Sequence, residues 1–338
     1  GATTPEIMSV EEIRRLYNPP RIVQLASNEN HLGPSPLAVE AMRRSLSDIA
    51  RYPDGGYGLR VKLAERFETK VENVIVGSGS EGIMSNIIRT FLLDDDEVLT
   101  TEAAFTGFPV LARPRGVADR TVQETKWRYY LRSHAAPITE RTNIIYIANH
   151  NNPTGTIFTR QEFDEFCRHV PDRVLIILDE AYFEYAKDNP RYPDSMHYRH
   201  DNVITLRTFS KAFGLAGIRI GYGFAHQELI RNLLKVKLPF EPSTMALAAG
   251  IAAVEDKEFL HRTLALNARG LKTLTDGLTG LGYTVVPSEA NFVMVELADE
   301  AAAAQTVERL IRSGIIVRPL QSFGLPQCVR ISTGLDEE

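Results

Sequence analysis

A single lysine, Lys211, stands in the stretch TFSKAFGLAGIRIGYG (208–223) among hydroxyl-bearing, small and apolar residues. Lysine is rarely buried without a partner, and desolvation lowers the pKa of its amine. An amine in this stretch is therefore costly unless it does chemistry. The alternative, in which Lys211 lays its stem over apolar surface and Arg219 is an ordinary surface arginine, stays open while each residue is taken alone.

Three further segments carry groups that could act together with an amine. The turn GSGSEG (77–82) opens a helix and offers free backbone N–H groups, which suit a phosphate, although such a turn is often only a turn. In ANHNNPTGTIF (148–158), the Asn152 amide can donate and accept, or simply form an Asn-Pro turn. In VLIILDEAY (174–182), Asp179 ends an apolar run, so its carboxylate pairs with a ligand cation or belongs to a structural ion pair.

Taken together, these segments predict a cofactor. Thr208 and Ser210 add two hydroxyl groups just before Lys211, and Arg219 adds a cation eight residues after it. A phosphate cradle, an amide, a counter-ion and an amine are the parts that hold pyridoxal phosphate on a lysine.

The elements that must position these groups follow from the hydrophobic pattern. Apolar runs of strand length alternate with helical stretches, which is typical of a largely parallel sheet covered by helices. The expected strands are 74–77, 97–101, 143–148, 174–180, 203–208 and 218–225. Helices are expected at 82–92 and at 161–169, the second entered through Thr159. Ligands of such sheets bind beyond the carboxyl ends of the strands, where the four segments lie.

The pattern changes after Pro239. A long helical region, 243–278, leads to YTVVPSEANFVMVEL and RLIRSGIIVRPL, which indicate a smaller α+β domain. We expect an N-terminal segment, 1–39, to pack with that domain, 241–338, while 40–240 forms the large domain. The length of 338 residues suits about two domains.

Composition excludes several classes of protein. A formal net charge of −5 argues against a general nucleic-acid binder. Two cysteines, Cys167 and Cys328, without CxxC or CxxH spacing make a disulfide framework or a metal site unexpected. The longest apolar run, Met245 to Val254, is too short to cross a bilayer, and no secretory pattern opens the chain. We therefore expect a cytoplasmic protein without a metal.

The order NNPTG, DEAY, SKAFGLAGIRIGY resembles the fold-type-I pyridoxal-phosphate aminotransferases. Within them, LASNENHLGPSP (25–36), ARYPD (50–54), RTFSKAFGLAGIR (207–219) and CVRISTG (328–334) resemble the histidinol-phosphate aminotransferase subfamily. The resemblance implies an α/β fold with a mostly parallel seven-stranded sheet between helices and a smaller α+β domain. It also implies a last C-terminal helix that this sequence does not contain. The implied reaction is histidinol-phosphate:2-oxoglutarate transamination in histidine biosynthesis.

The resemblance also implies roles for residues around the cofactor. Lys211 would form the Schiff base and move the substrate proton, and Asp179 would keep the pyridine nitrogen protonated. Asn152 and Tyr182 would bind the ring oxygen, and Phe105 would stack on the ring. The phosphate would be held by the amides of Ser80 and Glu81 together with Thr208, Ser210 and Arg219.

Other matching positions concern the substrate and a second subunit. The residues implied in substrate binding are Arg330, Arg318, Asn152, Tyr17 and Asn28. Tyr52 matches a tyrosine that reaches the phosphate from the second subunit, which implies a homodimer. His150 and His31 stand where relatives usually have proline. Either is a neutral loop change or a specificity residue near the substrate entrance.

Four alternative functions compete with this interpretation. An aromatic amino acid aminotransferase and, less favoured, a threonine-phosphate decarboxylase share the motifs and stay open. The aminotransferase-like sensor domain of bacterial transcription factors needs an N-terminal winged helix, for which 338 residues without a basic amphipathic start leave no room. A nicotinamide-dependent oxidoreductase is disfavoured because no GxGxxG follows the first strand.

Overall fold

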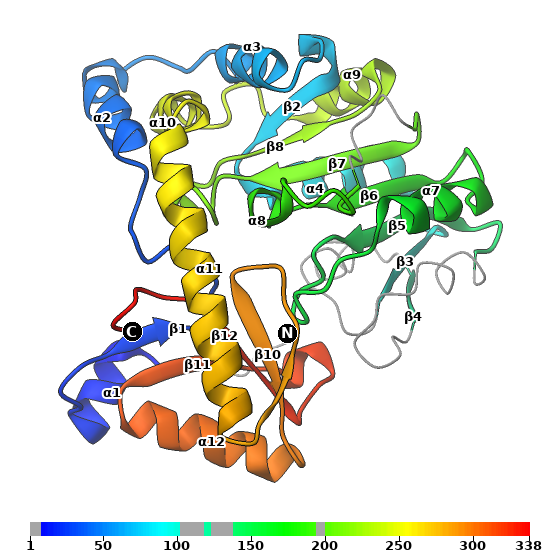
Figure 1. The fold of residues 1–338 in the computed structure, drawn as a ribbon. Helices are drawn as coiled ribbons and strands as arrows, with labels where there is room; N and C mark the ends of the chain where they lie inside the picture. The colour runs from blue at the N-terminus through cyan, green and yellow to red at the C-terminus, as the bar shows by residue number, and fades with distance from the viewer. Residues whose placement is uncertain (1–7, 102–117, 123–137, 194–199) are drawn as a thin grey trace.

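The computed structural model describes residues 8–101, 118–122, 138–193 and 200–338. They build two sheets, a larger one in the upper half of Figure 1 and a smaller one below it. The long helix α11 (Lys257–Gly280) runs between the two halves.

The larger sheet has seven strands in the order β2-β8-β7-β6-β5-β3-β4. Their bounds are β2 Val74–Gly77, β3 Glu97–Thr101, β4 Ala118–Val122, β5 Thr142–Ala148, β6 Leu175–Asp179, β7 Val203–Thr208 and β8 Gly221–Phe224. The pairs from β7 through β6, β5 and β3 to β4 are parallel, and β8 runs antiparallel to both of its neighbours. Every residue of β6 and β7 is buried, as expected for central strands covered on both faces. The predicted mostly parallel sheet is confirmed.

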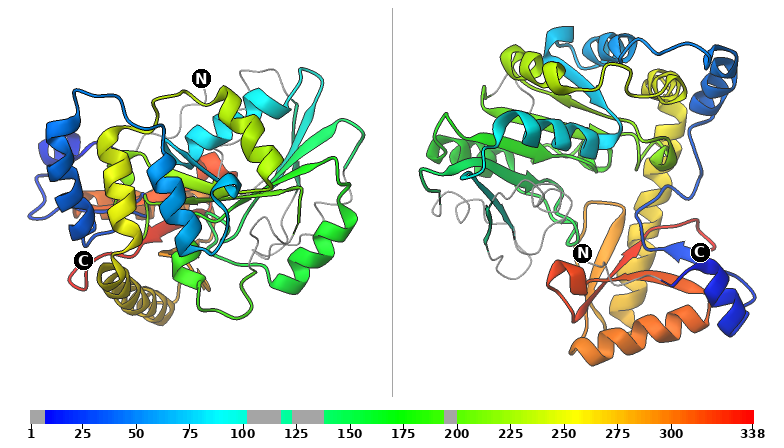
Figure 2. Two further views of the ribbon diagram at one scale, coloured as in Figure 1. Left: turned by 90° about the horizontal axis from the view of Figure 1, so that it is seen from above. Right: turned by 180° about the vertical axis from the view of Figure 1, so that it is seen from behind.

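Helices cover both faces of this sheet (Figure 2). They are α2 Pro36–Ser45, α3 Tyr57–Arg66, α4 Gly79–Phe91, α7 Arg160–His169, α8 Phe183–Ala186, α9 Gln227–Val236 and α10 Thr244–Val254, with short 3-10 turns η1 Leu46–Asp48, η2 Val71–Asn73 and η4 Ala216–Ile218. One apolar cluster joins α4 and α9 to the sheet, and another joins α2, α3 and α10 to it. The entry to α7 is the predicted one, because Thr159 and Glu162 cap each other's backbone N–H groups.

The smaller sheet has five strands in the order β1-β11-β12-β10-β9. Its elements are α1 Val10–Tyr17, β1 Val23–Leu25, β9 Thr284–Val286, β10 Phe292–Glu296, α12 Glu300–Arg312, β11 Ile315–Pro319, η5 Gln321–Phe323 and β12 Cys328–Ser332. Strand β1 pairs in parallel with β11, so the start of the chain completes a sheet made by its end. The C-terminal residues lie beside β1 in Figure 1.

Three boundaries differ from the sequence prediction. The expected helical region 243–278 is two helices, because Asp256 caps a new helix by accepting from the Phe259 N–H. The expected strand 218–225 is shorter at its start, where Arg219 has a left-handed backbone (φ 59°). Helix α4 begins at Gly79, not residue 82, which brings its N-terminus closer to β2.

Among the described residues, no helix is both long and apolar enough to cross a membrane.

Candidate active site

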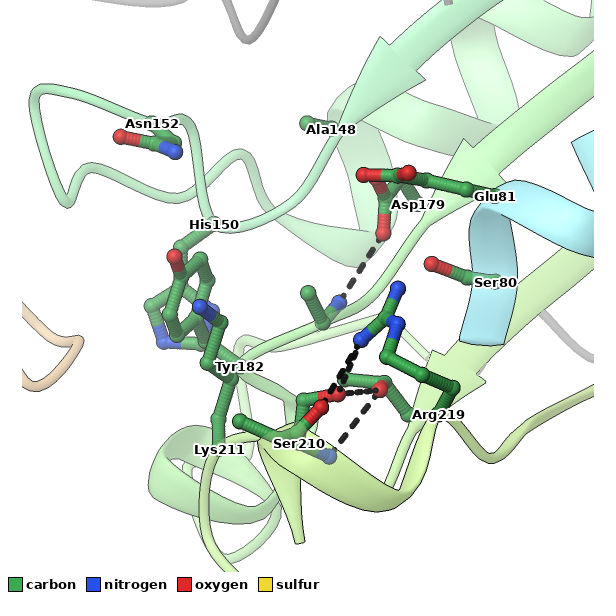
Figure 3. Close-up of a pocket in the computed structure, with 13 residues that line it drawn as sticks. Ser80, Glu81, Ala148, His150, Asn152, Asp179, Tyr182, Ser210, Lys211 and Arg219 are labelled. Atoms are coloured by element: carbon green, nitrogen blue, oxygen red, sulfur yellow. Dashed lines mark hydrogen bonds between the residues drawn. The ribbon is translucent and has the colours of Figure 1, made fainter. Parts of the chain in front are cut away.

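A pocket of about 190 Å³ lies at the carboxyl ends of β5, β6 and β7, beside the N-terminus of α4 (Figure 3). Its lining collects most of the residues that the sequence singled out. They are Ser80, Glu81, Ala148, His150, Asn152, Asp179, Ala181, Tyr182, Thr208, Ser210, Lys211, Ala216 and Arg219. Segments more than a hundred residues apart in sequence thus meet where an α/β sheet binds its ligands.

Asp179 stands at one end of the pocket, on the last residue of β6. Its carboxylate accepts hydrogen bonds from the Tyr146 hydroxyl and from the backbone N–H of Ala181 (3.2 Å). Burial raises the pKa of Asp179 to about 6, against the opposing effects of these two donors and of the Lys211 charge. An acid so placed is stabilised by a cationic ligand, because the protein gives its negative charge little solvation.

Lys211 follows β7 and lines the pocket beside Tyr182 (Figure 3). Its Nζ donates to the Ser27 carbonyl (3.1 Å) and lies 5.9 Å from the centre of the Tyr182 ring. The side chain is neither fully buried nor held by a carboxylate within ion-pair distance among the described residues. The amine is thus available to the pocket, with a carbonyl as its one described hydrogen-bond acceptor.

Another part of the pocket lining carries hydroxyls, a guanidinium and a helix N-terminus. The Thr208 Oγ donates to Ser210 Oγ (3.0 Å) and accepts from the Ser210 N–H (3.0 Å), and Arg219 Nη1 donates to Ser210 Oγ (3.5 Å). Glycine is favoured at position 79 by its left-handed backbone (φ 77°), and a Cβ there would also displace the Arg219 guanidinium, whose Nη2 would lie 2.6 Å away. In the described chain, no side chain caps the start of α4. Its first N–H groups therefore remain for an anion.

Tyr182 and Asn152 face the pocket from two loops, and other residues fix both side chains. The Tyr182 hydroxyl accepts from Asn28 Nδ2 (2.9 Å), and Asn28 Oδ1 accepts from Ser332 Oγ (2.8 Å). Asn152 Oδ1 accepts from Arg330 Nη1 (2.6 Å). Asn28 is buried, and its hydrogen bond to the hydroxyl orients the Tyr182 phenol.

Arg318 and Arg330 are direct cross-strand partners in β11 and β12. Arg330 is buried, and its Nη2 donates to the Ala26 carbonyl (2.6 Å). Burial and, to a smaller extent, the nearby Arg318 lower the pKa of Arg330 to about 10, against the opposing effect of Tyr182. Burial also lowers the pKa of Arg318. Like charges directly opposite each other in a sheet destabilise it unless an anion lies between them.

His150 is the least expected residue in the pocket lining. It is 1% exposed, its Nε2 lies 2.8 Å from the Glu289 carbonyl, and burial lowers its pKa to about 4. Because a carbonyl only accepts, Nε2 carries the proton of a neutral ring. His150 therefore joins the loop after β5 to the loop before β10, and Glu289 N–H donates to the Gly155 carbonyl (2.9 Å) beside it.

The remaining predicted residues lie away from the pocket or outside the described residues. Tyr17 packs in an apolar cluster with Ile13 and Ile316, with the Arg312 guanidinium 5.6 Å from its ring centre. Tyr52 is 79% exposed and stacks on Phe240. His31 Nδ1 lies 2.5 Å from Glu338 Oε2. Phe105 lies outside the described residues.

Comparison with known proteins decides the family. The model of the aminotransferase class I and II family matches residues 20–338. The chain belongs to this family. It is 41% identical to histidinol-phosphate aminotransferase 2 of Pseudomonas aeruginosa over 97% of this chain and 90% of the relative. It is 40% identical to histidinol-phosphate aminotransferase of an Anaeromyxobacter species, over 97% and 91%.

Solved structures agree with this assignment. The histidinol-phosphate aminotransferase of Sinorhizobium meliloti, in complex with pyridoxal-5'-phosphate, superposes with a TM-score of 0.88 at 29% identity, over 99% of this chain and 94% of that one. An aspartate aminotransferase of Thermus thermophilus superposes with a TM-score of 0.87 at 24% identity, which supports the fold alone. The predicted fold-type-I aminotransferase is confirmed.

The family and the solved relative imply pyridoxal phosphate as the cofactor of this aminotransferase, and the pocket fits that group. The uncapped N-terminus of α4 and the Arg219 guanidinium suit a phosphate at one end. Asp179, whose buried charge lacks a cation within ion-pair distance in the described residues, suits a protonated ring nitrogen at the other. Lys211 belongs to the same lining, beside Tyr182 (Figure 3).

The sequence analysis missed Tyr146, which donates to Asp179. It lies in the run NIIYIA, where it looked like one more core residue. A signal was present in the pattern, since Tyr146 is two residues before Ala148 and so shares its face of β5, and Ala148 is the register partner of Asp179. Ser27, which accepts from Lys211 through its backbone, leaves no signal in side-chain chemistry.

Proposed function

We propose that this aminotransferase transfers the amino group of histidinol phosphate to 2-oxoglutarate, with pyridoxal phosphate as cofactor, in histidine biosynthesis. The observation that supports histidinol phosphate as the substrate is the cross-strand pair Arg318–Arg330. It occurs in a chain whose relatives at about 40% identity and near full length are named histidinol-phosphate aminotransferases.

The arginine pair favours a phosphate over a carboxylate. The two arginines are cross-strand neighbours with lowered pKa values, and neither has a carboxylate within ion-pair distance among the described side chains. A phosphate monoester carries between one and two negative charges at neutral pH and three acceptor oxygens, so it can offset both cations. A single carboxylate offsets one. The pair thus suits the phosphate end of an amino alcohol phosphate.

The contacts of the pocket suggest how its residues would act. Bound pyridoxal phosphate would supply a carbonyl carbon that accepts the amino group and a ring that takes up electrons. Arg219, Ser210 and the start of α4 would hold the cofactor phosphate. Asp179 would hold a proton on the ring nitrogen, because a buried carboxylate favours a cation beside it.

Proton transfer falls to Lys211. Its Nζ lies 5.9 Å from the centre of the Tyr182 ring and donates to the Ser27 carbonyl, which as an acceptor leaves the nitrogen lone pair of a neutral amine free. In that form the amine would take the substrate Cα proton and return it elsewhere. Asn152 and Tyr182 would orient the ring oxygen. Both are held by residues of the small sheet or its N-terminal strand region, Arg330 and Asn28, so the substrate arginine also fixes a cofactor contact.

We also propose a homodimer in which Tyr52 contributes to the partner's site. Tyr52 stacks on Phe240 at a ring-centroid distance of 4.2 Å on the surface. Phe240 and other large apolar residues near the pair in sequence are exposed, namely Leu46, Ile49, Tyr57 and Leu238. Apolar residues grouped in this way are typical of a surface that another subunit covers.

Donor competition tests the proposed substrate. The holoenzyme would receive histidinol phosphate, phenylalanine, tyrosine, tryptophan or threonine phosphate while the absorbance of the bound cofactor is followed. We expect histidinol phosphate to react with the highest kcat/KM. A higher value for an aromatic amino acid would make the protein an aromatic aminotransferase, and carbon dioxide release from threonine phosphate would make it a decarboxylase.

A further inference from the structure

A second cavity adjoins the segments that carry the active-site residues. Its volume is about 230 Å³, compared with about 190 Å³ for the active-site pocket. Phe183 and Glu184 of α8 line it, and so do Phe209 and Phe213, which lie before and after Lys211. The two cavities therefore take alternate side chains from the same two segments.

The walls of this second cavity are mostly aromatic. They comprise Phe67, Phe183, Phe209, Phe213 and Tyr222, with Val254 and Leu260 as aliphatic neighbours. The rings are in contact, with centroid distances of 5.2 Å for Phe209–Tyr222 and 5.5 Å for Phe209–Phe213. A cavity with such walls accepts a flat apolar ring.

Glu184 is a buried acid in this aromatic lining. It is 4% exposed, and its Oε1 is buried without a hydrogen-bond partner among the described residues. The nearest large cation, Arg207, donates through Nε and Nη2 to Glu180 instead (3.2 and 3.1 Å). A buried acceptor without a donor lowers the stability of the protein. A ligand that donates a hydrogen bond to Glu184 would remove this cost, and its affinity would be higher for that reason.

The remaining charged groups of the cavity are mostly cationic. Arg66, Lys187 and Lys257 are exposed side chains of the lining. Asp256 also belongs to it, but its carboxylate already accepts from Ser35 Oγ (2.5 Å) and from the Phe259 N–H (3.3 Å) in the first turn of α11. Lys187 pairs with exposed Asp188, a contact that contributes little in water. The exposed part of the lining is therefore suited to an anion.

We propose that this cavity binds a small aromatic carboxylate that carries a hydrogen-bond donor on its ring. The ring would lie among the five aromatic walls, the donor would reach Glu184, and the carboxylate would lie beside Lys187 and Lys257. Because the cavity shares its walls with the Lys211 segment, the ligand would contact the residues that position the catalytic amine. The inference does not depend on which donor the aminotransferase uses.

Calorimetric titration of the holoenzyme with 4-hydroxyphenylacetate tests the proposal. We expect one site per chain with a Kd below about 1 mM. Phenylacetate lacks the ring donor and 4-hydroxyphenylethanol lacks the carboxylate. The Kd of each should therefore be higher than that of 4-hydroxyphenylacetate by roughly fivefold or more. Equal binding of all three compounds would refute the roles given to Glu184 and the lysines, and no binding of the first would refute the site.

Two variants distinguish this cavity from the active site, whose arginines could also hold a carboxylate. Leu260→Trp fills the cavity from α11 and should weaken binding by roughly tenfold or more. His261→Trp, the matched control, adds the same ring at the exposed neighbouring position and should bind as the wild type does. Unchanged binding by Leu260→Trp would overturn the proposal. If that variant does not fold, Lys187→Gln with Lys257→Gln serves in its place, and unchanged binding there has the same meaning.

Discussion

The buried carboxylate of Asp179 makes a testable contribution to the stability of the cofactor-free protein. Burial raises the pKa of Asp179 from 3.8 to about 6. The folded state therefore binds this proton more tightly than the unfolded state does. The stability that Asp179 contributes is complete below its unfolded pKa and is lost as the pH rises through about 6. A difference of about 2 pKa units corresponds to a loss of ~3 kcal/mol at pH 8.

Asp179→Asn removes the charge and keeps the shape. Asparagine accepts through one oxygen, so it loses one of the hydrogen bonds from Tyr146 and Ala181, at a cost of about 1 kcal/mol. We expect the apo variant to be more stable than the wild type by about 2 kcal/mol at pH 8. At about pH 5 the wild-type carboxyl is mostly protonated in the folded state, so the advantage falls below ~1 kcal/mol.

Urea unfolding of both apoproteins at the two pH values measures this difference. Asp172→Asn is the matched control, because Asp172 is exposed just before β6 and should show neither effect. In the holoenzyme, Asp179→Asn should be harmful instead of stabilising, since the cofactor ring loses its counter-ion. We expect weaker cofactor binding and a single-turnover rate lower by orders of magnitude. An apo variant less stable than the wild type at pH 8, with a normal single-turnover rate, would refute the reasoning and leave Asp179 a structural residue.

Three further predictions concern other residues of the proposed active site. Tyr146→Phe removes a hydrogen bond that lowers the pKa of Asp179, so the acidic limb of the pH–rate profile should move up by roughly one unit, and an unmoved limb would contradict this contact. Arg318→Gln should raise KM for histidinol phosphate by on the order of tenfold or more with little change in KM for phenylalanine, and equal changes would argue against a phosphate site. Lys211→Ala should fold without transferring an amino group. Mixed with inactive Tyr52→Ala, it should regain activity in mixed dimers, and no recovery in a verified mixture would count against shared sites.

The sequence predicted most of the fold and the pocket because their signals are local. Each central strand is a continuous apolar run, and the groups around Lys211 and Asp179 lie in short motifs at strand ends. The break at Asp256 followed a local rule that the prediction overlooked, since an aspartate before a helix caps it.

What the sequence could not supply depends on contacts between distant segments. The role of Asn28 in substrate binding stays a prediction, but its hydrogen bond to Tyr182 depends on the pairing of β1 with β11, which the sequence did not reveal. The contact between His150 and the Glu289 carbonyl joins residues 139 apart in sequence. A histidine in a loop gives no indication in the sequence of which backbone carbonyl it will contact. The roles of Tyr17 and Tyr52 stay predictions. Tyr17 lies in an apolar cluster, and the role of Tyr52 depends on a second subunit.

The most direct test of the proposed function is a half-reaction without acceptor. Holoenzyme would be mixed with one equivalent of histidinol phosphate per chain, and the amino group on the cofactor and the keto phosphate product would be quantified. We predict transfer of one amino group per chain, release of that group as glutamate when 2-oxoglutarate is added, and no transfer in Lys211→Ala. An unchanged cofactor in the wild type, or equal transfer in the variant, would contradict the account.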